Sequence, residues 1–247
     1  MRYFIEFAYK GTKYHGWQMQ PNAISVQQVL TQALSIILKT EIDLVGAGRT
    51  DAGVHAKQMF AHFDINTNIK CELLIHKLNS YLPKDIAVGG FYKVSNDAHA
   101  RFNATKRTYE YHIHTQKNAF DSDDSYYSKN NLNINLMNKA CEILKNHINF
   151  ECFSKVHTDV NTFNCKIENA IWTKNKTKII FTISADRFLR NMVRAIVGTM
   201  INIGLEKVSL QQFIEIIESK DRKQAGFSVP AHGLYLTKVE YDFIENE

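Results

Sequence analysis

The chain has 247 residues, of which 45% are hydrophobic and 22% are charged. A chain of this length can bury a sizeable core without a metal or disulfide framework, and it suits one large domain or two modest ones. Lys and Arg outnumber Asp and Glu by 30 to 25, and the resulting net charge of +5 permits an anionic partner without indicating one.

Local composition excludes several classes of protein. The four cysteines form no C-x-x-C pair, which is typical of reduced thiols in a cytoplasmic protein and not of a disulfide or zinc framework. Glu6 interrupts the first apolar run, so no signal peptide is expected. The longest apolar stretch, 195–205, is roughly half as long as a membrane span. We therefore expect a cytoplasmic protein that is neither secreted nor membrane-bound.

Hydrophobic periodicity predicts alternating strands and helices in the first half of the chain. Residues 3–9 alternate in hydrophobicity, which indicates a strand, and Ser25 with Gln28 forms a capping box before a helix that reaches about Lys39. The further elements expected in this half are strands at 42–45, 58–64 and 86–94 and a helix at 71–81.

The second half repeats this layout without repeating the sequence. The elements expected here are strands at 107–115, 165–174, 177–185 and 234–243, and helices at about 136–147, at 187–203 and at 209–219. Gly204 is expected to stop the second of these helices, and Ser209 with Gln212 forms another capping box. The polar segments 116–134 and 155–164 are expected to be loops. We thus predict an α+β fold of two similar halves, 1–105 and 106–247.

The loop 46–53, Gly-Ala-Gly-Arg-Thr-Asp-Ala-Gly, follows the predicted strand at 42–45 and carries Asp51 between glycines. It lacks the third glycine of a dinucleotide fingerprint and the Lys-Ser/Thr of a phosphate loop, so a nucleotide-dependent enzyme is not indicated. Two interpretations stay open from these residues alone. Asp51 is either a turn residue that bonds its own backbone or a catalytic carboxylate presented on a rigid scaffold, with Arg49 close by.

The predicted helix at 187–203 places three arginines at i, i+3 and i+7, namely Arg187, Arg190 and Arg194. Such a stripe is usually a solvated face. Arg194, however, lies close to apolar neighbours, and a partly buried arginine needs an anion, which a loop aspartate could supply.

The predicted strand at 107–115 places Tyr109 and Tyr111 on one face, with His112 and His114 on the other. A strand tyrosine is usually part of the core, but it can also serve as a platform on which a base stacks. No H-E-x-x-H motif or acidic cluster accompanies the two histidines, so we expect no metal site.

Taken together, these segments resemble the tRNA pseudouridine synthase A family along the whole chain. The matching motifs, in order, are Tyr14-His-Gly-Trp-Gln18, Ser25-Val-Gln27, Gly48-Arg-Thr-Asp-Ala-Gly-Val-His55, His99-Ala-Arg-Phe102, Arg107-Thr-Tyr-Glu-Tyr111, Phe188-Leu-Arg-Asn-Met-Val-Arg-Ala-Ile-Val-Gly198 and Gly233-Leu-Tyr-Leu236. The motif that ends at His55 resembles the family's catalytic signature. One departure is Met19, where the family commonly has arginine.

The resemblance implies an isomerase that converts uridine to pseudouridine at positions 38, 39 and 40 of the tRNA anticodon arm. It implies a homodimer without metal or organic cofactor, whose two halves join into one extended, mostly antiparallel sheet with helices on one face and a central catalytic cleft. By match to the motifs, Asp51 is the catalytic nucleophile, Tyr109 packs on the flipped uracil and accepts a proton, and Arg194 is the cation paired with Asp51. Other basic residues are expected to bind the substrate: Arg49, Arg101, Lys106, Arg107 and Arg190.

The chemistry agrees with these residue types. Isomerisation breaks a glycosidic bond and forms a carbon–carbon bond without a redox change, so a carboxylate and a base suffice. Attack by Asp51 on C6 or on C1′, or assistance of a glycal route, all stay open. The alternative is a catalytically silent tRNA-binding protein on the same scaffold. Retention of Asp51, Tyr109 and Arg194 favours the enzyme.

Overall fold

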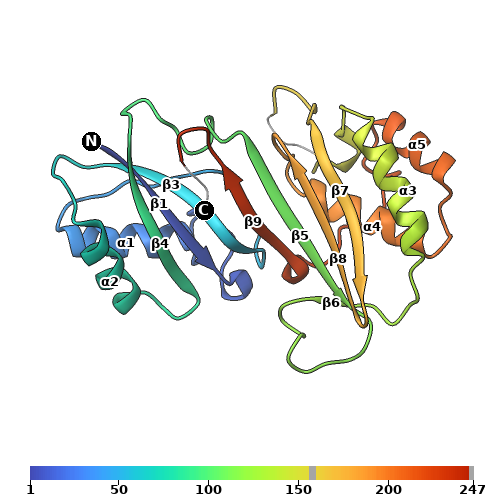
Figure 1. Cartoon of the computed structure of the whole chain (residues 1–247), viewed down its shortest axis with the longest axis horizontal. Helices are drawn as coiled ribbons and strands as arrows, with labels where there is room; N and C mark the ends of the chain where they lie inside the picture. The colour runs from blue at the N-terminus through green and yellow to red at the C-terminus, as the bar shows by residue number, and fades with distance from the viewer. Residues whose placement is uncertain (156–159, 245–247) are drawn as a thin grey trace. The chain divides into compact units, whose positions relative to one another are not determined.

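The computed structural model describes residues 1–155 and 160–244 and divides the chain into two compact units (Figure 1). Unit 1 contains residues 1–105 together with the C-terminal residues from Leu236 on, and unit 2 contains residues 106–235. The sequence instead groups the C-terminal residues with the second half. They belong to unit 1, where the backbone N–H of Thr105 donates to the carbonyl of Glu240 at 2.8 Å and the backbone N–H of Val239 donates to the side chain of Gln58 at 3.0 Å.

The described residues form nine strands and five α-helices, which confirms an α+β fold of two similar halves. The strands are β1 (Arg2–Tyr9), β2 (Val45–Gly46), β3 (His55–Asp64), β4 (Ile86–Val94), β5 (Lys106–His114), β6 (Tyr126–Tyr127), β7 (Ile167–Asn175), β8 (Lys178–Ala185) and β9 (Leu234–Glu240). The α-helices are α1 (Val26–Leu38), α2 (Cys71–Tyr81), α3 (Ile134–Lys145), α4 (Met192–Gly204) and α5 (Leu210–Ser219). Short 3-10 helices occur at Gly11–Lys13, Glu151–Phe153 and Ala231–Gly233.

Strand β1 is central in unit 1 because it pairs antiparallel with both β3 and β4. Ile5, which is fully buried, lies opposite Ala61 of β3 and Phe91 of β4. Strand β9 lies beside β3, and there the backbone N–H of Val239 donates to the side chain of Gln58 at 3.0 Å. These strands form the rigid layer from which the loop containing Asp51 projects.

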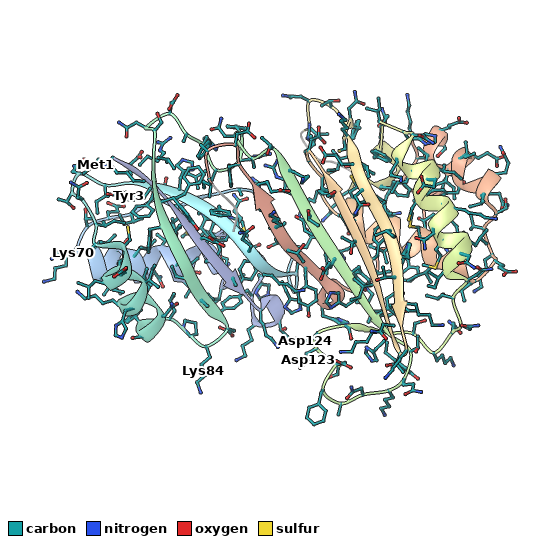
Figure 2. All side chains as sticks on the ribbon, viewed as in Figure 1. Met1, Tyr3, Lys70, Lys84, Asp123 and Asp124 are labelled. Atoms are coloured by element: carbon teal, nitrogen blue, oxygen red, sulfur yellow. The ribbon has the colours of Figure 1, made fainter. Side chains whose placement is uncertain are left out.

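The two helices of unit 1 lie where the sequence predicts them. Helix α1 begins after Ser25, whose hydroxyl accepts from the backbone N–H of Gln28 at 3.2 Å. Helix α2 has the predicted bounds, 71–81, and packs against α1 and β4. Figure 2 shows Lys70 and Lys84 on either side of α2, with their side chains pointing outward.

The predicted strand at 42–45 is wrong except at its last residue, because β2 begins only at Val45. Side chains of α1 use the backbone groups that a strand would need. The N–H of Ile42 donates to the hydroxyl of Ser35 at 3.1 Å, and the carbonyl of Leu44 accepts from the side chain of Gln27 at 2.7 Å. The chain therefore reaches β2 as an irregular segment tied to α1.

In unit 2, β8 lies between β5 and β7 and pairs antiparallel with both, while β6 pairs parallel with β5. Lys176, in the left-handed region at φ +51°, makes the turn between β7 and β8. Across this hairpin Trp172 lies opposite Phe181, and their rings stack with centroids 4.7 Å apart. Both side chains are buried under α3 and α4, since α3 packs on β7 and on α4.

The helix predicted at 187–203 begins instead at Met192, and the sequence prediction is wrong for its first turn. Asn191 lies in the left-handed region at φ +66°, and its side-chain amide donates to the hydroxyl of Ser228 at 2.6 Å. Just upstream, the carboxylate of Asp186 accepts from the backbone N–H of the following residue at 2.7 Å. A helix cannot pass through a left-handed residue, so it starts after Asn191.

Other predicted bounds differ by a few residues. The helix predicted at about 136–147 spans 134–145, and the last strand ends at Glu240 instead of 243. The capping box of Ser209 and Gln212 is confirmed at α5. The segment 116–134, predicted to be a loop, contains the short strand β6. Of the other predicted loop, 155–164, residues 156–159 lie outside the described residues. Over the described chain, none of the helices is long and apolar enough to cross a membrane.

Candidate active site

The loop that carries Asp51 is closed at its base by the pairing of β2 with β3. Gly46 lies opposite Ala61, and the backbone N–H of Ala47 donates to the carbonyl of Phe60 at 2.8 Å. The chain leaves the strands after Ala47 and rejoins them at His55, where β3 begins. Both ends of the loop are thus fixed in the same strand layer.

The segment 14–17 holds the loop from the side through backbone hydrogen bonds. The N–H of Gly53 donates to the carbonyl of Tyr14, and the N–H of Trp17 donates to the carbonyl of Thr50, both at 3.3 Å. Since Gly53 and Thr50 flank the catalytic candidate, its backbone is held on both sides. Residues 14–17 are part of a motif that resembles the family, but the sequence does not predict their contact with the loop.

Glycine at position 16 is required by this contact. Gly16 has φ +84°, and a Cβ there would collide with the carbonyl oxygen of Thr50 and lie 3.2 Å from the carbonyl carbon of Asp51. Only a residue without a side chain lets the two backbones approach so closely.

Aromatic residues attach the same loop to β1. The ring of Trp17 stacks on Phe7 with centroids 5.2 Å apart, and a Cβ on Gly46 would collide with the Trp17 indole. The hydroxyl of Tyr9 and that of Thr50 form a hydrogen bond of 2.8 Å. These contacts orient Thr50, and with it the residue that follows.

His55, the last residue of the motif that resembles the catalytic signature, is buried and stabilises the fold. It is 1% exposed, and its Nδ1 accepts from the backbone N–H of Gly11 at 3.1 Å. The turn before it is closed by a bond from the N–H of Val54 to the carbonyl of Asp51 at 3.1 Å. The side chain of Asp51 itself is only half-buried, and Arg49 is exposed. The loop therefore presents a carboxylate to the surroundings on a backbone that has little freedom to move.

In unit 2, Tyr109 lies on β5 opposite Ile183 of β8. Its ring is half-buried and meets Phe188 edge to face, with centroids 5.1 Å apart. Tyr111, two residues on, is fully buried, and its hydroxyl donates to the carbonyl of Pro230 at 2.9 Å. Burial raises the pKa of Tyr111, so that phenol stays protonated. Of these two tyrosines, only Tyr109 has a ring that a substrate could reach.

Arg194 lies in the first turn of α4 and is half-buried. Its Nε donates to the carbonyl of Val229 at 2.7 Å, and its own carbonyl accepts from the N–H of Val229 at 3.2 Å. Residues 226–229, here called the bracing segment, therefore fix both the backbone and the guanidinium of Arg194.

The bracing segment is held against α4 by two glycines. A Cβ on Gly198 would collide with the carbonyl oxygen of Phe227, and one on Gly226 would lie 2.7 Å from the backbone nitrogen of Thr199. The N–H of Gly226 also donates to the hydroxyl of Thr199 at 2.8 Å. Gly198 belongs to a motif that resembles the family, but the sequence does not predict that residues 226–229 pack against it.

The predicted basic stripe on one helix face does not exist. Arg187 and Arg190 precede α4, so they do not share a helical face with Arg194. Arg190 is exposed, and its carbonyl accepts from the backbone N–H of Lys155 at 3.0 Å. The physical reason is the left-handed Asn191, which separates the upstream arginines from the helix.

The remaining predicted binding residues lie in both units. Arg49 and Arg101 are exposed residues of unit 1. Lys106 and Arg107 are half-buried in unit 2, where Lys106 lies 3.8 Å from Glu168 and Arg107 donates to the carbonyl of Asp186 at 2.6 Å.

The two histidines of β5, His112 and His114, both have a polar side-chain partner. Nε2 of His112 lies 2.9 Å from a carboxylate oxygen of Glu110, and Nδ1 of His114 lies 2.6 Å from the hydroxyl of Ser125. In the parts of the chain that the structure describes, no group of three or more His, Cys, Asp or Glu side chains could hold a metal ion.

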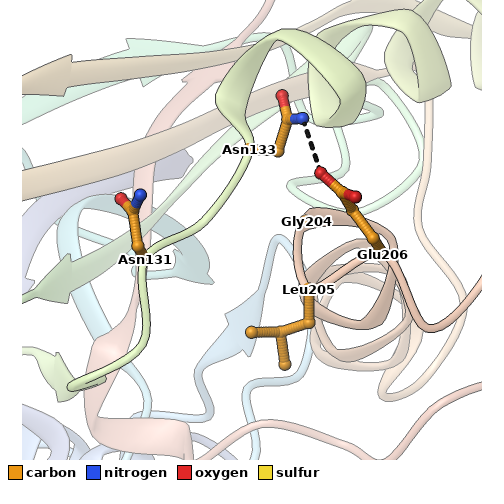
Figure 3. Close-up of a pocket in the computed structure, with 5 residues that line it drawn as sticks. All are labelled: Asn131, Asn133, Gly204, Leu205 and Glu206. Carbon is orange, nitrogen blue, oxygen red and sulfur yellow. Dashed lines mark hydrogen bonds between the residues drawn. The ribbon is translucent and has the colours of Figure 1, made fainter.

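A shallow hollow of about 370 Å³ lies at the C-terminal end of α4 (Figure 3). It is lined by Asn131, Asn133, Gly204, Leu205 and Glu206. The amide of Asn133 donates to Glu206 at 3.0 Å, and its oxygen caps α3. These polar groups already serve the fold, and none of the predicted site residues lines the hollow.

Comparison with known proteins gives a consistent result. A family model described as tRNA pseudouridine synthase matches residues 6–103 and 141–242. The chain is 50% identical to the tRNA pseudouridine synthase A of Parabacteroides distasonis over 241 residues, which cover 97% of this chain and 96% of the relative. It is also 50% identical to that of Bacteroides thetaiotaomicron, over 97% of this chain and 90% of the relative. Identity to that of Thermoanaerobacter pseudethanolicus is 41%, over 96% and 98%.

Proposed function

Since this chain belongs to the tRNA pseudouridine synthase family, we propose that it converts uridine to pseudouridine at positions 38, 39 and 40 of the tRNA anticodon arm, with Asp51 as nucleophile. The observation that carries the proposal is the loop around Asp51. Its backbone is fixed on both sides by segment 14–17, while the carboxylate stays half-exposed. A catalytic group that must attack one atom of a substrate reacts faster when its backbone is held in a fixed position.

The reaction needs few chemical groups. The bond from C1′ to N1 breaks, the base turns, a bond from C1′ to C5 forms, and C5 loses a proton while N1 gains one. Atoms and electrons balance without a redox partner or group donor, so the proposal includes no metal and no organic cofactor. A carboxylate can hold one fragment covalently or stabilise the charge that develops when the first bond breaks.

In the same proposal, Tyr109 packs on the uracil and accepts the proton from C5, and Arg194 supplies the cation for the Asp51 carboxylate. The half-exposed ring of Tyr109 supports the first role. The bracing segment supports the second, because it fixes the guanidinium of Arg194 through the carbonyl of Val229. A positive charge beside a carboxylate favours its ionised form, which the nucleophile needs.

Basic side chains would hold the RNA while the target base leaves the stack. Flipping a base costs a few kcal/mol, and phosphate contacts can offset that cost. We include in this set Arg49, Arg101, Lys106, Arg107 and Arg190. The proposal also takes the protein to be a cytoplasmic homodimer.

The proposal is tested with unmodified tRNA transcripts that carry uridine at only one of positions 38, 39 and 40. After incubation, carbodiimide treatment and primer extension report pseudouridine as stops. We expect stops with the wild-type protein and none with Asp51→Asn or Asp51→Ala, both of which should still bind tRNA. Glu41→Gln, which neutralises an exposed acid of the same unit, should keep full turnover.

Two results would contradict the proposal in different ways. Near-normal turnover by Asp51→Asn would show that Asp51 is not the nucleophile, although the protein would still be a pseudouridine synthase. Tight tRNA binding by the wild-type protein without any stops would instead indicate a catalytically silent tRNA-binding protein.

A further inference from the structure

The turn 99–103 of unit 1 presents one aromatic ring to solvent in a fixed position. Phe102 at its tip is 74% exposed. Single exposed apolar residues are common on protein surfaces, so exposure alone indicates nothing. What distinguishes Phe102 is the number of contacts that hold the turn beneath it.

His99 organises this turn through its imidazole. Nδ1 accepts from the backbone N–H of Arg101 at 3.1 Å and from that of Phe102 at 3.4 Å. The backbone N–H of His99 donates in turn to the side chain of Asn103 at 2.6 Å. The pKa of His99 is lowered, first by burial and then by the nearby arginines, so the ring stays neutral and keeps Nδ1 as an acceptor.

The turn is also attached to the strands behind it. The N–H of Ala100 donates to Nδ1 of the buried His62 at 3.1 Å, and its carbonyl accepts from the hydroxyl of Tyr241 at 2.6 Å. Arg2, at the start of β1, donates to the carbonyl of Ala98 at 2.9 Å. Hydrogen bonds from β1, β3 and the C-terminal segment thus hold a turn of only a few residues.

A column of rings runs from the core to this tip. Phe4 stacks on His62 with centroids 5.9 Å apart, His62 meets His99 at 4.6 Å, and His99 meets Phe102 at 4.3 Å. The outermost ring, that of Phe102, is thereby packed against the imidazole of His99. The guanidinium of Arg101 lies over the same ring, 5.8 Å from its centroid.

A supported aromatic face next to an arginine suits one class of ligand. Unpaired nucleobases stack on aromatic rings and on guanidinium planes, and a neighbouring cation can pair with their phosphate. Arg101 is exposed, so its positive charge lies where it can meet the phosphate of a base that stacks on the adjacent ring. We propose that Arg101 and Phe102 form a stacking platform for an unpaired nucleobase of the tRNA substrate. The inference rests on the proposed function only in taking tRNA as the RNA.

The test measures the binding of a fluorescein-labelled, unmodified tRNA transcript by anisotropy, in the Asp51→Asn background so that no substrate is converted. Phe102→Ala should raise Kd by about 5- to 150-fold, the range expected for loss of one base–aromatic stack. Phe102→Trp should restore affinity. Phe102→Leu, which keeps apolar bulk but has no π-face, should not. The matched control is Tyr81→Ala, which removes another exposed aromatic ring of unit 1 and should leave Kd unchanged.

Salt dependence separates the two residues. Arg101→Gln should reduce the slope of log K against log salt by nearly one, because one phosphate contact is lost, whereas Phe102→Ala should lower affinity without changing the slope. A Phe102→Ala variant within twofold of its parent overturns the proposal, and so does Phe102→Leu with full affinity. A changed sedimentation coefficient in Phe102→Ala also overturns it, because the ring would then lie between copies of the chain.

Failure of the platform and failure of the proposed function give different results. Pseudouridine formation by the wild-type protein tests only the proposed function. If that assay is negative while Phe102→Ala still loses affinity, the platform stands without the reaction. If wild-type turnover is present and Phe102→Ala binds normally, only the platform fails.

Discussion

Replacing Gly16 by alanine tests whether the Asp51 loop owes its position to the backbone of segment 14–17. The new Cβ would collide with the carbonyl oxygen of Thr50 and lie 3.2 Å from the carbonyl carbon of Asp51. Ordinary contact requires the two backbones to separate by about 1 Å. Such a separation also breaks the hydrogen bond from the N–H of Trp17 to Thr50.

The energetic cost has two parts. Alanine in the left-handed region that Gly16 occupies, at φ +84°, costs about 1–2 kcal/mol. Loss of the hydrogen bond between Trp17 and Thr50 costs about 0.5–1.5 kcal/mol more. For a chain of this size the total of about 1.5–3.5 kcal/mol lowers the unfolding temperature by about 3–14 °C. Displacement of a nucleophile by about 1 Å should in addition lower kcat/KM by about 10²-fold.

Thermal unfolding and pseudouridine formation on one tRNA transcript measure the two effects separately. Gly48→Ala is the control for stability, because it lies in the same loop and a Cβ there meets no heavy atom within 4 Å. We expect Gly48→Ala to unfold within about 2 °C of the wild type. A Gly16→Ala protein that does the same and keeps its kcat/KM would refute the reasoning.

Two further predictions concern Gly198, which packs against the bracing segment, and the buried His62. Gly198→Ala places a Cβ against the carbonyl oxygen of Phe227, so the bracing segment must leave α4, and we expect kcat/KM to fall at least about tenfold with little change in tRNA affinity. Gly89→Ala, whose Cβ meets nothing closer than 3.9 Å, is its control, and equal kinetics of the two variants would contradict the prediction. Burial lowers the pKa of His62 from 6.5 to about 4. As the pH drops from 6.5 towards 4, the unfolded chain therefore takes up a proton at His62 before the folded chain does. The free energy of unfolding should fall over this range by at most about 3 kcal/mol. His62→Asn, which can still accept from the N–H of Ala100 but does not titrate, should remove that part of the pH dependence, and an unchanged acid transition would show that His62 is not its source.

The sequence predicts elements best where local signals suffice. Helix α2 has the predicted bounds, 71–81, and the capping box at Ser209 is present, because both depend on residues a few positions apart. The start of α4 depends instead on Asn191, whose side chain bonds Ser228 far along the chain. The irregular path at 42–44 likewise depends on side chains of α1. Contacts of this kind leave no periodic pattern in the sequence.

The candidate site shows the same division. Asp51 could be singled out because it stands in a long and specific motif between glycines. The support of its loop could not, because the contact between Gly16 and Thr50 joins backbones that only the fold brings together. The ring of Phe102 was visible as part of a motif, but its support by His99 depends on the conformation of the turn.

The contacts around segment 14–17 also bear on Met19, where the family resemblance leads us to expect an arginine. The backbone N–H of Met19 donates to the side chain of Gln27 at 2.8 Å, and the same side chain binds the carbonyl of Leu44. The side chain of Met19 is exposed and takes no part in these bonds. Position 19 therefore contributes its backbone to the support of the segment that leads into β2, and methionine and arginine supply this backbone equally well. Met19→Arg should accordingly leave the unfolding temperature unchanged, and any effect of the replacement should come from its added charge towards the RNA backbone, as a steeper salt dependence of tRNA binding.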